Sequence, residues 1–488
     1  MNTNAPIGVV VIARHGDRSG FYQDPDSYTA SDTEITTLGE RQCFQLGETI
    51  RQIYTSNASS ATASQGSRQI AGLSSTTLDA RQVNSTADAG GEGSTIYDSA
   101  IAFWQGFYPP NLAVSNTTLA DGSIVTSPLQ GYQYVQVNTV LPSDDVDFEP
   151  WTNCAAWSNR TDELYGSDTF KAKAEAEAPF FDELRGSGLL GNRTINLKNA
   201  YNVYDYMNVQ SVHNETFANE LAKLPEGTLS RAADVASWLQ YSLFSDPAPD
   251  GLGNLAGRAI FPRIINSLEA FITEANEVKI AHYHMSYKPF LSIFNMTNLA
   301  AATEPAFPNP TSMVDYASGA VFELRPNSAS TASAASSRSR YDVRFGFRNG
   351  SSTQSDVTYY PLFGSGQLDM DLATFSQNLE PYAIANNSVW CDLCSNDGTV
   401  PACSTWSLAK DYEALATRYK AAVPALSNAS AGGIGAGVTI VVALGVVALM
   451  RYLGLVSFGK RGTNTAADRY PLNDRRSSYK GSIASSFT

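Results

Sequence analysis

The 488-residue chain is poor in basic residues and in histidine. It has 33 lysines and arginines against 47 aspartates and glutamates, a formal charge of −14, and four histidines. Such an acidic chain repels phosphate backbones, which excludes a broad nucleic-acid-binding surface. Hydrophobic residues make up 43% of the chain. That share is ample for a packed core and excludes disorder throughout the chain.

Cysteine is also scarce, with five residues. Cys391, Cys394 and Cys403 lie close together, whereas Cys43 and Cys154 are isolated. No histidine lies within about a hundred residues of the cluster, so a zinc ion there would lack its fourth ligand. We therefore expect no metal and no cofactor, and we predict one or two disulfides near the end of the folded body, with Cys154 as a candidate partner. Cys43 is predicted to be a buried thiol on a helix.

Charge is missing altogether from Ala431–Met450, a run of twenty residues. At ~1.5 Å per residue, a helix of this length crosses the ~30 Å hydrocarbon core of a bilayer. Residues 451–488 then carry a net charge of +5, whereas residues 1–450 carry −19. The positive-inside rule puts the basic tail in the cytosol and the acidic body outside the cell or in a lumen. A buried core helix is the alternative.

Ten N-x-[ST] sequons support this single-pass topology, because all of them precede the apolar run. They begin at Asn57, Asn84, Asn116, Asn159, Asn192, Asn214, Asn295, Asn349, Asn386 and Asn428. The polar start, Met1 to Pro6, is unlike a signal peptide. Three explanations stay open: a longer natural N-terminus, export directed by the apolar run, or a tail-anchored body in the cytosol.

An α/β fold is predicted by the apolar periodicity. Ile7–Ala13 is a continuous apolar run, typical of a strand buried on both faces of a parallel or mixed sheet. Thr37–Glu40 is a capping box that begins a helix with Cys43, Leu46, Ile50 and Ile53 on one side. The other predicted elements are helices and strands at Ile96–Phe107, Phe170–Leu190, Leu229–Phe244, Leu252–Ile272, Val278–Ala281, Ser318–Arg325, Tyr341–Arg348 and Trp406–Ala422.

These elements define the domain organisation. We predict a mixed, mostly parallel sheet flanked by helices in a body that spans residues 1–425. Residues 150–275 form an inserted helical lobe, because several helical patterns with polar breaks follow one another there. Residues 426–430 are a linker, residues 431–450 a transmembrane helix and residues 451–488 a cytosolic tail.

Four residues directly after the first strand carry a chemical signal: Arg14, His15, Gly16 and Arg18. Ligands of open α/β sheets bind beyond the carboxyl ends of the strands, where these residues fall. His15 can act as a nucleophile and form a phosphohistidine, and two arginines can hold a phosphate bidentately. Gly16 allows close approach of the backbone. This combination predicts phosphoryl transfer.

The order of the motifs resembles the histidine acid phosphatases, the branch of the histidine phosphatase superfamily that includes phytases. The motifs are RHGDR, TLGERQ, a Ser99-Ala100 pair that eight residues separate from Pro109-Pro110, and a histidine before an apolar helix. The resemblance extends from Ile7 to Thr405. It implies a phosphoglycerate mutase-like fold, phosphomonoesterase activity and a phosphorylated small-molecule substrate.

Two parts of the family's site are missing from the sequence. Asn84 and Thr95 stand where the family carries a second pair of arginines. The strand after the lobe should carry His-Asp, whose aspartate protonates the leaving group, but no acidic residue occurs between residues 277 and 304. We assign His282 to the family's histidine because a small residue precedes it, and His284 remains the alternative register.

Glu92 and Asp17 are the candidates to replace the missing acid. Glu92 lies in the glycine-rich stretch 89–94, which is either an amide nest for phosphate or a tight loop. The first functional hypothesis is a membrane-anchored phosphomonoester hydrolase that acts through a phosphohistidine, weakened or retuned. Its predicted catalytic residues are Arg14, His15, Arg18 and His282, and its predicted substrate-binding residues are Arg14, Gly16, Arg18 and Glu92. The second is an inactive relative that serves as a surface glycoprotein or a phosphate-ligand binder. The sequence specifies neither the substrate nor the oligomeric state.

Overall fold

The computed structural model describes residues 5–55, 68–88, 92–141, 144–327, 337–351, 356–396, 398 and 400–422. The chain divides into two compact units, Met1–Asp411 and Tyr412–Thr488. The predicted linker, transmembrane helix and tail lie outside the described residues. Among the helices that the structure describes, none is long and apolar enough to cross a membrane.

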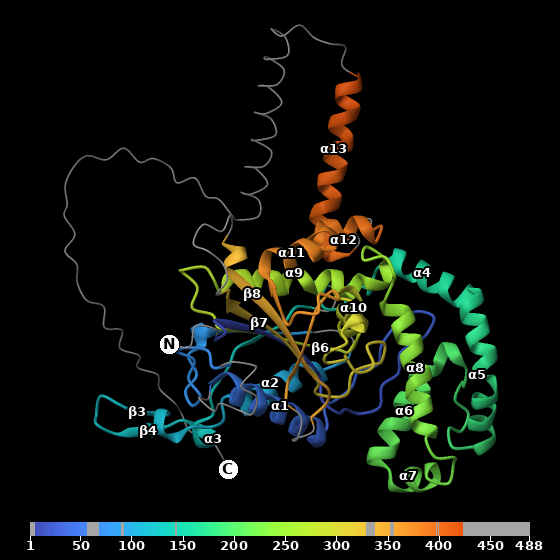
Figure 1. The fold of residues 1–488 in the computed structure, drawn as a ribbon, viewed down its shortest axis with the longest axis horizontal. Coiled ribbons are helices and arrows are strands. Elements are labelled where there is room, and N and C mark those ends of the chain that lie inside the picture. Colours follow the sequence, from blue (N-terminus) through green and yellow to red (C-terminus); the bar gives the residue numbers. More distant parts are fainter. Residues whose placement is uncertain are drawn as a thin grey trace, which may run out of the picture. The chain divides into compact units, whose positions relative to one another are not determined.

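An eight-stranded sheet forms the centre of the first unit, in the order β10-β8-β7-β1-β6-β2-β5 with β9 beside β8 (Figure 1). The strands are β1 Gly8–Arg14, β2 Val83–Ala87, β5 Val137–Asn138, β6 Ile280–Met285, β7 Gly319–Pro326, β8 Tyr341–Arg348, β9 Thr358–Tyr360 and β10 Asp369–Asp371. β1, β6, β2 and β5 pair in parallel, whereas β7 pairs antiparallel with both β1 and β8. The predicted mixed sheet flanked by helices is confirmed, and its parallel part consists of β1, β6, β2 and β5.

Both faces of β1 are buried, as its continuous apolar run predicts. Val9 and Val11 pack with residues of α1 (Thr37–Thr55) and α2 (Thr95–Phe107). Val10 and Ile12 pack in a second core cluster with residues of α9 (Leu255–Ala270), which covers the opposite face of the sheet (Figure 1). The C-terminal end of β1 is therefore held at the middle of a three-layer body, with its side chains in fixed positions.

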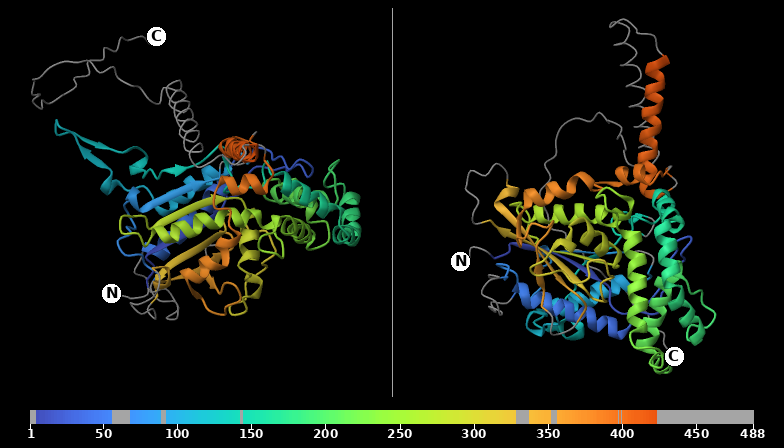
Figure 2. Two further views of the ribbon diagram at one scale, coloured as in Figure 1. Left: turned by 90° about the horizontal axis from the view of Figure 1, so that it is seen from above. Right: turned by 45° about the vertical axis from the view of Figure 1, so that its right-hand side comes forward.

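The inserted lobe consists of the helices α4 to α8, and Figure 2 shows them gathered at one end of the sheet. They are α4 Ala155–Gly166, α5 Asp168–Ser187, α6 Ala200–His213, α7 Glu215–Leu221 and α8 Thr228–Phe244. The last helix predicted for the lobe, α9 (Leu255–Ala270), packs on the sheet instead. α9 contacts β1, whereas α4 to α8 mainly contact one another and other helices, so the lobe ends before α9.

The remaining α-helices are α3 Pro128–Gly131, which precedes the lobe, and four helices that follow it: α10 Lys288–Met296, α11 Leu372–Leu379, α12 Asn387–Leu393 and α13 Ser404–Ala422. A separate two-stranded hairpin is formed by β3 (Asn116–Thr118) and β4 (Ile124–Thr126).

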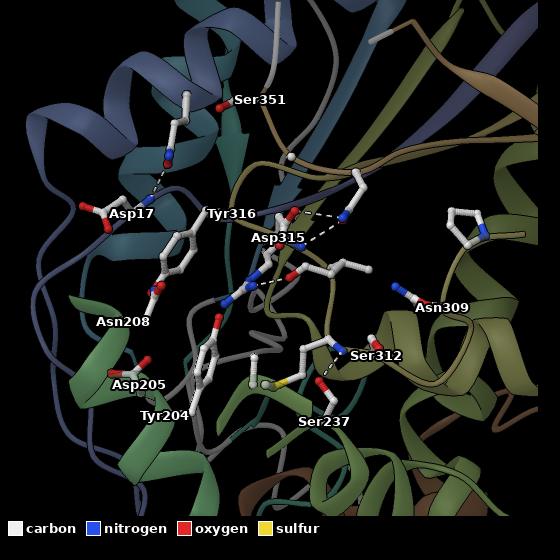
Figure 3. A pocket seen from close by; sticks show the side chains of 18 of the residues that line it. Asp17, Tyr204, Asp205, Asn208, Ser237, Asn309, Ser312, Asp315, Tyr316 and Ser351 are labelled. Atoms are coloured by element: carbon white, nitrogen blue, oxygen red, sulfur yellow. Dashed lines mark hydrogen bonds between the residues drawn. The ribbon is translucent and has the colours of Figure 1, made fainter. Parts of the chain in front are cut away.

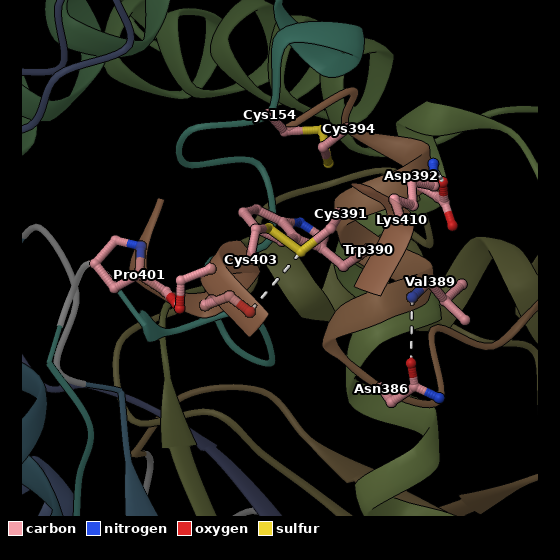
Figure 4. Close-up of a disulfide and its surroundings, with 12 residues drawn as sticks. Cys154, Asn386, Val389, Trp390, Cys391, Asp392, Cys394, Pro401, Cys403 and Lys410 are labelled. Atoms are coloured by element: carbon pink, nitrogen blue, oxygen red, sulfur yellow. Dashed lines mark hydrogen bonds and ion pairs between the residues drawn. A yellow bond between two sulfur atoms is a disulfide. The ribbon is translucent and has the colours of Figure 1, made fainter. Parts of the chain in front are cut away.

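Two disulfides lie at the end of the body, and one of them connects it to the start of the lobe (Figure 4). Cys154 pairs with Cys394, and Cys391 pairs with Cys403. The indole N–H of Trp390 donates to the carbonyl of Pro150, 2.8 Å away, beside the first bridge. Cys43 is a buried free thiol, as the sequence predicts, and burial raises its pKa to about 12.

Two predicted element boundaries are corrected by the structure. α1 begins at Thr37, but the capping hydroxyl belongs to Thr36, which accepts from the Gly39 amide at 3.1 Å. The strand predicted to end at Ala281 continues to Met285, so His282 and His284 both lie inside β6. This second correction matters for the site, because it fixes which way each imidazole points.

Candidate active site

The turn after β1 is pressed against the start of α1. A Cβ on Gly16 would lie 2.3 Å from the carbonyl oxygen of Gly39, and the Gly16 amide donates to Ser99 Oγ at 3.1 Å. Only glycine is tolerated at position 16, where the turn passes the backbone of α1. The predicted close approach of Gly16 is therefore to a helix, and its amide is already bonded within the protein.

His15 is fully buried and has one defined tautomer. Its Nδ1 lies 2.8 Å from the carbonyl oxygen of Gly16. A carbonyl oxygen only accepts, so Nδ1 carries the proton and Nε2 keeps its lone pair. Burial, assisted by Arg14 and Arg18, lowers the pKa of His15 to about 3, although Glu92 opposes the shift. The imidazole is therefore neutral, and the lone pair of Nε2 has the chemistry of a nucleophile.

The carboxylate of Glu92 faces this atom. Its Oε2 lies 3.3 Å from His15 Nε2 and 3.1 Å from Arg18 Nε, and the side chain is 2% exposed. Burial raises the pKa of Glu92, but His15, Arg18, Lys288 and Arg14 outweigh it and lower the pKa to about 2. A lone pair and an ionised carboxylate repel each other at this distance unless a proton lies between them.

Arg18 is fully occupied by contacts within the protein. Its guanidinium makes a bidentate ion pair with Asp205 of α6, at 2.9 and 3.3 Å, and donates to the hydroxyl of Tyr201 at 3.2 Å. Asp205 also accepts from the Phe21 amide at 3.0 Å. The lobe therefore fixes the arginine beside Glu92. The sequence analysis missed both α6 residues, whose signal was a tyrosine and an aspartate four residues apart on one helix face.

Arg14 has the most open environment of the predicted site residues. Its guanidinium donates to the carbonyl of Val314 and lies over the rings of Tyr316 and Tyr287, 4.4 and 5.1 Å from their centroids. Its Nε has no hydrogen-bond partner among the described residues, although the side chain is only 8% exposed.

The two histidines of β6 form a buried row that leads toward His15. His282 Nδ1 lies 2.9 Å from Ser85 Oγ, and His282 Nε2 lies 3.2 Å from His284 Nδ1. Burial lowers the pKa of His284 well below its usual value, and the charges of His282 and His15 lower it further. His284 is therefore the member of the row next to His15, and His282, which the sequence analysis preferred, lies behind it.

The positions of the missing family residues offer no replacement. Asn84 is exposed on β2, and Thr95 Oγ1 lies 2.8 Å from the hydroxyl of Thr33. Met285 is buried in the apolar core. Oδ2 of Asp17, the other candidate acid, is hydrogen-bonded to His213 Nε2 at 2.6 Å. Glu92 is therefore the candidate acid that lies beside His15 Nε2. Residues 89–91 of the glycine-rich stretch lie outside the described residues.

A cavity of about 620 Å³ opens beside this cluster (Figure 3). Arg14, Asp17, Asp205 and Tyr316 line it, together with residues of α6, α8 and the segment 308–316. The ring centroid of Tyr316 lies 5.5 Å from that of His15. Among the predicted site residues Arg14 lines the cavity, whereas His15, Arg18 and Glu92 are buried and are not part of its lining.

Comparisons with known proteins identify the fold. No protein-family model matches the chain, and no curated protein matches its sequence. Among solved structures, the phytase from Citrobacter braakii matches at 12% identity with a TM-score of 0.50, covering 78% of this chain and 98% of the phytase. Klebsiella sp ASR1 phytase matches at 12% identity and a TM-score of 0.49, with the same coverage. A multiple inositol polyphosphate phosphatase from Bifidobacterium longum matches at 12% identity and 0.42, covering 78% and 93%.

The first of these likenesses shows that the chain shares the fold of that phytase. The resemblance expected from the RHG motif is thus confirmed for the fold. At this identity, the reaction has to be argued from the site itself.

Proposed function

We propose that the chain is a phosphomonoester hydrolase that acts through a phosphohistidine at His15, with Glu92 as the proton donor. The observation that carries the proposal is the 3.3 Å approach of Glu92 Oε2 to His15 Nε2. Glu92 thereby supplies the acid that the family carries after the histidine of β6 and that this chain lacks.

The first step transfers the phosphoryl group to the enzyme. The lone pair of His15 Nε2 attacks phosphorus, the bond to the ester oxygen breaks, and the alcohol leaves with a proton from Glu92. Arg14 and Arg18 offset the charge on the equatorial oxygens. In the second step water attacks the phosphohistidine, Glu92 accepts the proton of the water, and phosphate is released.

Glu92 must be protonated for the first step, although its pKa is about 2 in the ligand-free site. A bound phosphate brings negative charge close to the carboxylate, which raises the pKa of Glu92. The carboxylate must also move, because a 3.3 Å contact between Oε2 and Nε2 leaves no room for a phosphoryl group. Both requirements predict slow turnover.

The second candidate is an inactive relative that serves as a surface glycoprotein or phosphate-ligand binder. It is favoured by the contacts of Arg18, whose donors are all taken by Glu92, Asp205, Tyr201 and the Ser19 carbonyl. For either candidate we propose a single-pass membrane protein with its body outside the cell or in a lumen. The apolar run 431–450, the basic tail and the sequons support that topology.

The deciding experiment is an assay of the purified full-length protein on an aryl phosphate and an alkyl phosphate between about pH 3 and pH 8. Activity should be lost in His15→Asn. Base-quenched turnover should also trap an acid-labile phosphoryl group on the wild type and none on that variant. Absence of turnover on both esters, with no rise in melting temperature on adding phosphate, would favour the inactive relative.

A further inference from the structure

The segment 112–141, which contains the β3–β4 hairpin, exposes a concentration of apolar side chains. Eight of the fifteen large apolar side chains that are exposed among the described residues lie in it: Leu112, Val114, Leu119, Ile124, Val125, Leu129, Tyr134 and Leu141. The segment has one charged side chain, Asp121. Monomeric soluble proteins rarely leave a large apolar surface open to water, so this surface indicates an interface.

The hairpin has no neighbouring strand among the described residues. β3 and β4 pair with each other and not with the main sheet, and Figure 2 shows them projecting from the rest of the first unit. An isolated two-stranded hairpin is marginally stable in water, and each edge presents unpaired N–H and C=O groups. A further strand beside the hairpin would stabilise it and satisfy those groups.

The hydrogen bonds of the hairpin show which main-chain groups of β4 face its open edge. The amide of Leu119 donates to the carbonyl of Ser123 at 2.8 Å, so Ser123 faces β3. Main-chain groups alternate in direction along a strand, so those of Val125 also face β3. The N–H and C=O groups of Ile124 and Thr126 therefore point the other way, where no described strand pairs with β4.

We infer that this edge is a dimer interface, at which β4 pairs antiparallel with β4 of a second copy of the chain. A two-fold axis at Val125 brings Ile124 opposite Thr126 of the partner subunit, so the outward groups of both strands form hydrogen bonds. The sequon at Asn116 lies on β3, which becomes an outer strand of the four-stranded sheet, so a glycan there stays off the axis. This interface does not depend on the proposed hydrolase function.

The exposed apolar area fits a dimer of ordinary size. A fully exposed aliphatic side chain presents on the order of 100 Å² of apolar surface. The eight side chains are between 46% and 72% exposed, so together they present roughly 500 Å². Each partner of a standard interface buries about 800 Å², of which about 450 Å² is apolar. The near absence of charge also allows two copies of an acidic chain to meet here.

A bilayer suits the hairpin less well than a second copy does. In hydrocarbon the outward main-chain groups of β4 would lose their hydrogen bonds to water and gain none. Segment 112–141 also contains no lysine or arginine that could bind anionic lipid headgroups. A second β4 supplies a donor and an acceptor at the required positions.

Cysteine crosslinking of the full-length protein tests the arrangement. Across the axis, the two Cα atoms of Val125 should lie about 4.5 Å apart, which a disulfide can bridge. Oxidation of Val125→Cys should therefore give a covalent dimer on a non-reducing gel. Thr117→Cys is the control, because Thr117 is the exposed partner of Val125 on β3, and the two β3 strands lie three spacings, about 14 Å, apart. Equal crosslinking in the two variants, or none in Val125→Cys, would overturn the inference.

The mass of the full-length protein in detergent gives a second test. Wild type should sediment as a dimer. Val125→Asp puts two like charges across the axis and should give a monomer with unchanged phosphatase activity, whereas Thr117→Asp should stay dimeric. A dimeric Val125→Asp would contradict the interface. A monomeric wild type, whose Val125→Cys variant resists a charged maleimide, would place the hairpin in a bilayer and overturn the inference.

Discussion

Glu92 Oε2 lies in front of His15 Nε2, 3.3 Å away. The carboxylate reaches this position from the segment before α2, and Arg18 Nε holds it at 3.1 Å. In the mechanism that we propose, this is the place where the phosphoryl group binds. A phosphate ester would then have to compete with a carboxylate of the protein itself.

Replacement of this carboxylate gives the first prediction. In Glu92→Gln, hydrolysis of an alkyl phosphate should fall by roughly 10²- to 10⁴-fold, the value of a general acid. The phenolate of an aryl phosphate with an acidic phenol leaves without much need of a proton. The rate of hydrolysis of this ester should therefore change by less than about tenfold. Glu40→Gln, which changes an exposed carboxylate on α1, is the control. An alkyl rate that stays or rises would show that Glu92 only competes with the substrate.

The ion pair between Arg18 and Asp205 gives the second prediction. Asp205→Asn keeps the shape of the side chain but leaves Arg18 without its bidentate partner in a fully buried position. Breaking a buried pair costs about 3–5 kcal/mol, so the free energy of unfolding in urea should fall by several kcal/mol. Asp182→Asn breaks an exposed pair with Arg185 and should cost below about 1 kcal/mol. Equal losses in the two variants would contradict the assigned role.

Acid should destabilise the body, because His15, His282 and His284 are buried in the neutral form. Burial lowers the pKa of His15 and of His282 to about 3. In the unfolded chain they titrate near 6.5, so between these values the unfolded state binds more protons. The free energy of unfolding should therefore fall as the pH falls, by up to about 1.4 kcal/mol per pH unit for each histidine.

Urea midpoints between about pH 7 and pH 4 measure this dependence. His282→Gln removes one titrating group, and its midpoint should fall less steeply with pH than that of the wild type. A midpoint that does not change over this range would show that the imidazoles are not held neutral.

The disulfides should contribute unequally to stability. The Cys154–Cys394 bridge closes 240 residues, and the Cys391–Cys403 bridge closes 12. Loop-closure entropy then gives roughly 5 and 3 kcal/mol. Replacing each pair by serine should lower the free energy of unfolding in that order, measured without reductant. Equal losses would indicate that native-state contacts, rather than chain entropy, set the contribution.

Glycan mapping tests the proposed topology. Seven of the sequon asparagines are exposed: Asn84, Asn116, Asn159, Asn192, Asn214, Asn349 and Asn386. Asn295 is half-buried, and its amide donates to the Asp246 carbonyl and to Asn254 at 2.7 and 2.9 Å. Mass spectrometry of the expressed protein should find glycans at exposed sites and none at Asn295. A protein without any glycan would contradict the extracytoplasmic body.

The elements with a strong apolar period were predictable from the sequence. β1, α1, α2, β7 and β8 each bury an apolar run or stripe, and the sequence bounds fall within a few residues of the observed ones. The short motif after β1 was equally readable, because its residues are contiguous and their chemistry is local. The row of histidines was not, since the side chains of His282 and His284 are oriented only by the full length of β6.

The partner of Arg18 could not be predicted for a different reason. Tyr201, Asn202 and Asp205 are buried polar residues of α6, so that helix lacks a simple apolar stripe. Buried polar groups find their partners only in the tertiary structure. Asp205 lies 187 residues from Arg18 in the chain. A periodic pattern of residues indicates local structure and gives no sign of a contact between residues so far apart.

The Cys154–Cys394 bridge also has a mechanical consequence. β1 and β2 lie outside the closed segment, whereas β6 to β10 and the lobe lie inside it. A force applied to the two ends of the chain therefore bypasses the segment and pulls β1 from its place between β6 and β7. The bridge shortens the fully stretched chain by roughly 80 nm, at ~3.3–3.6 Å for each of the 240 residues. Under tension the strand that leads to His15 is removed before the lobe can extend.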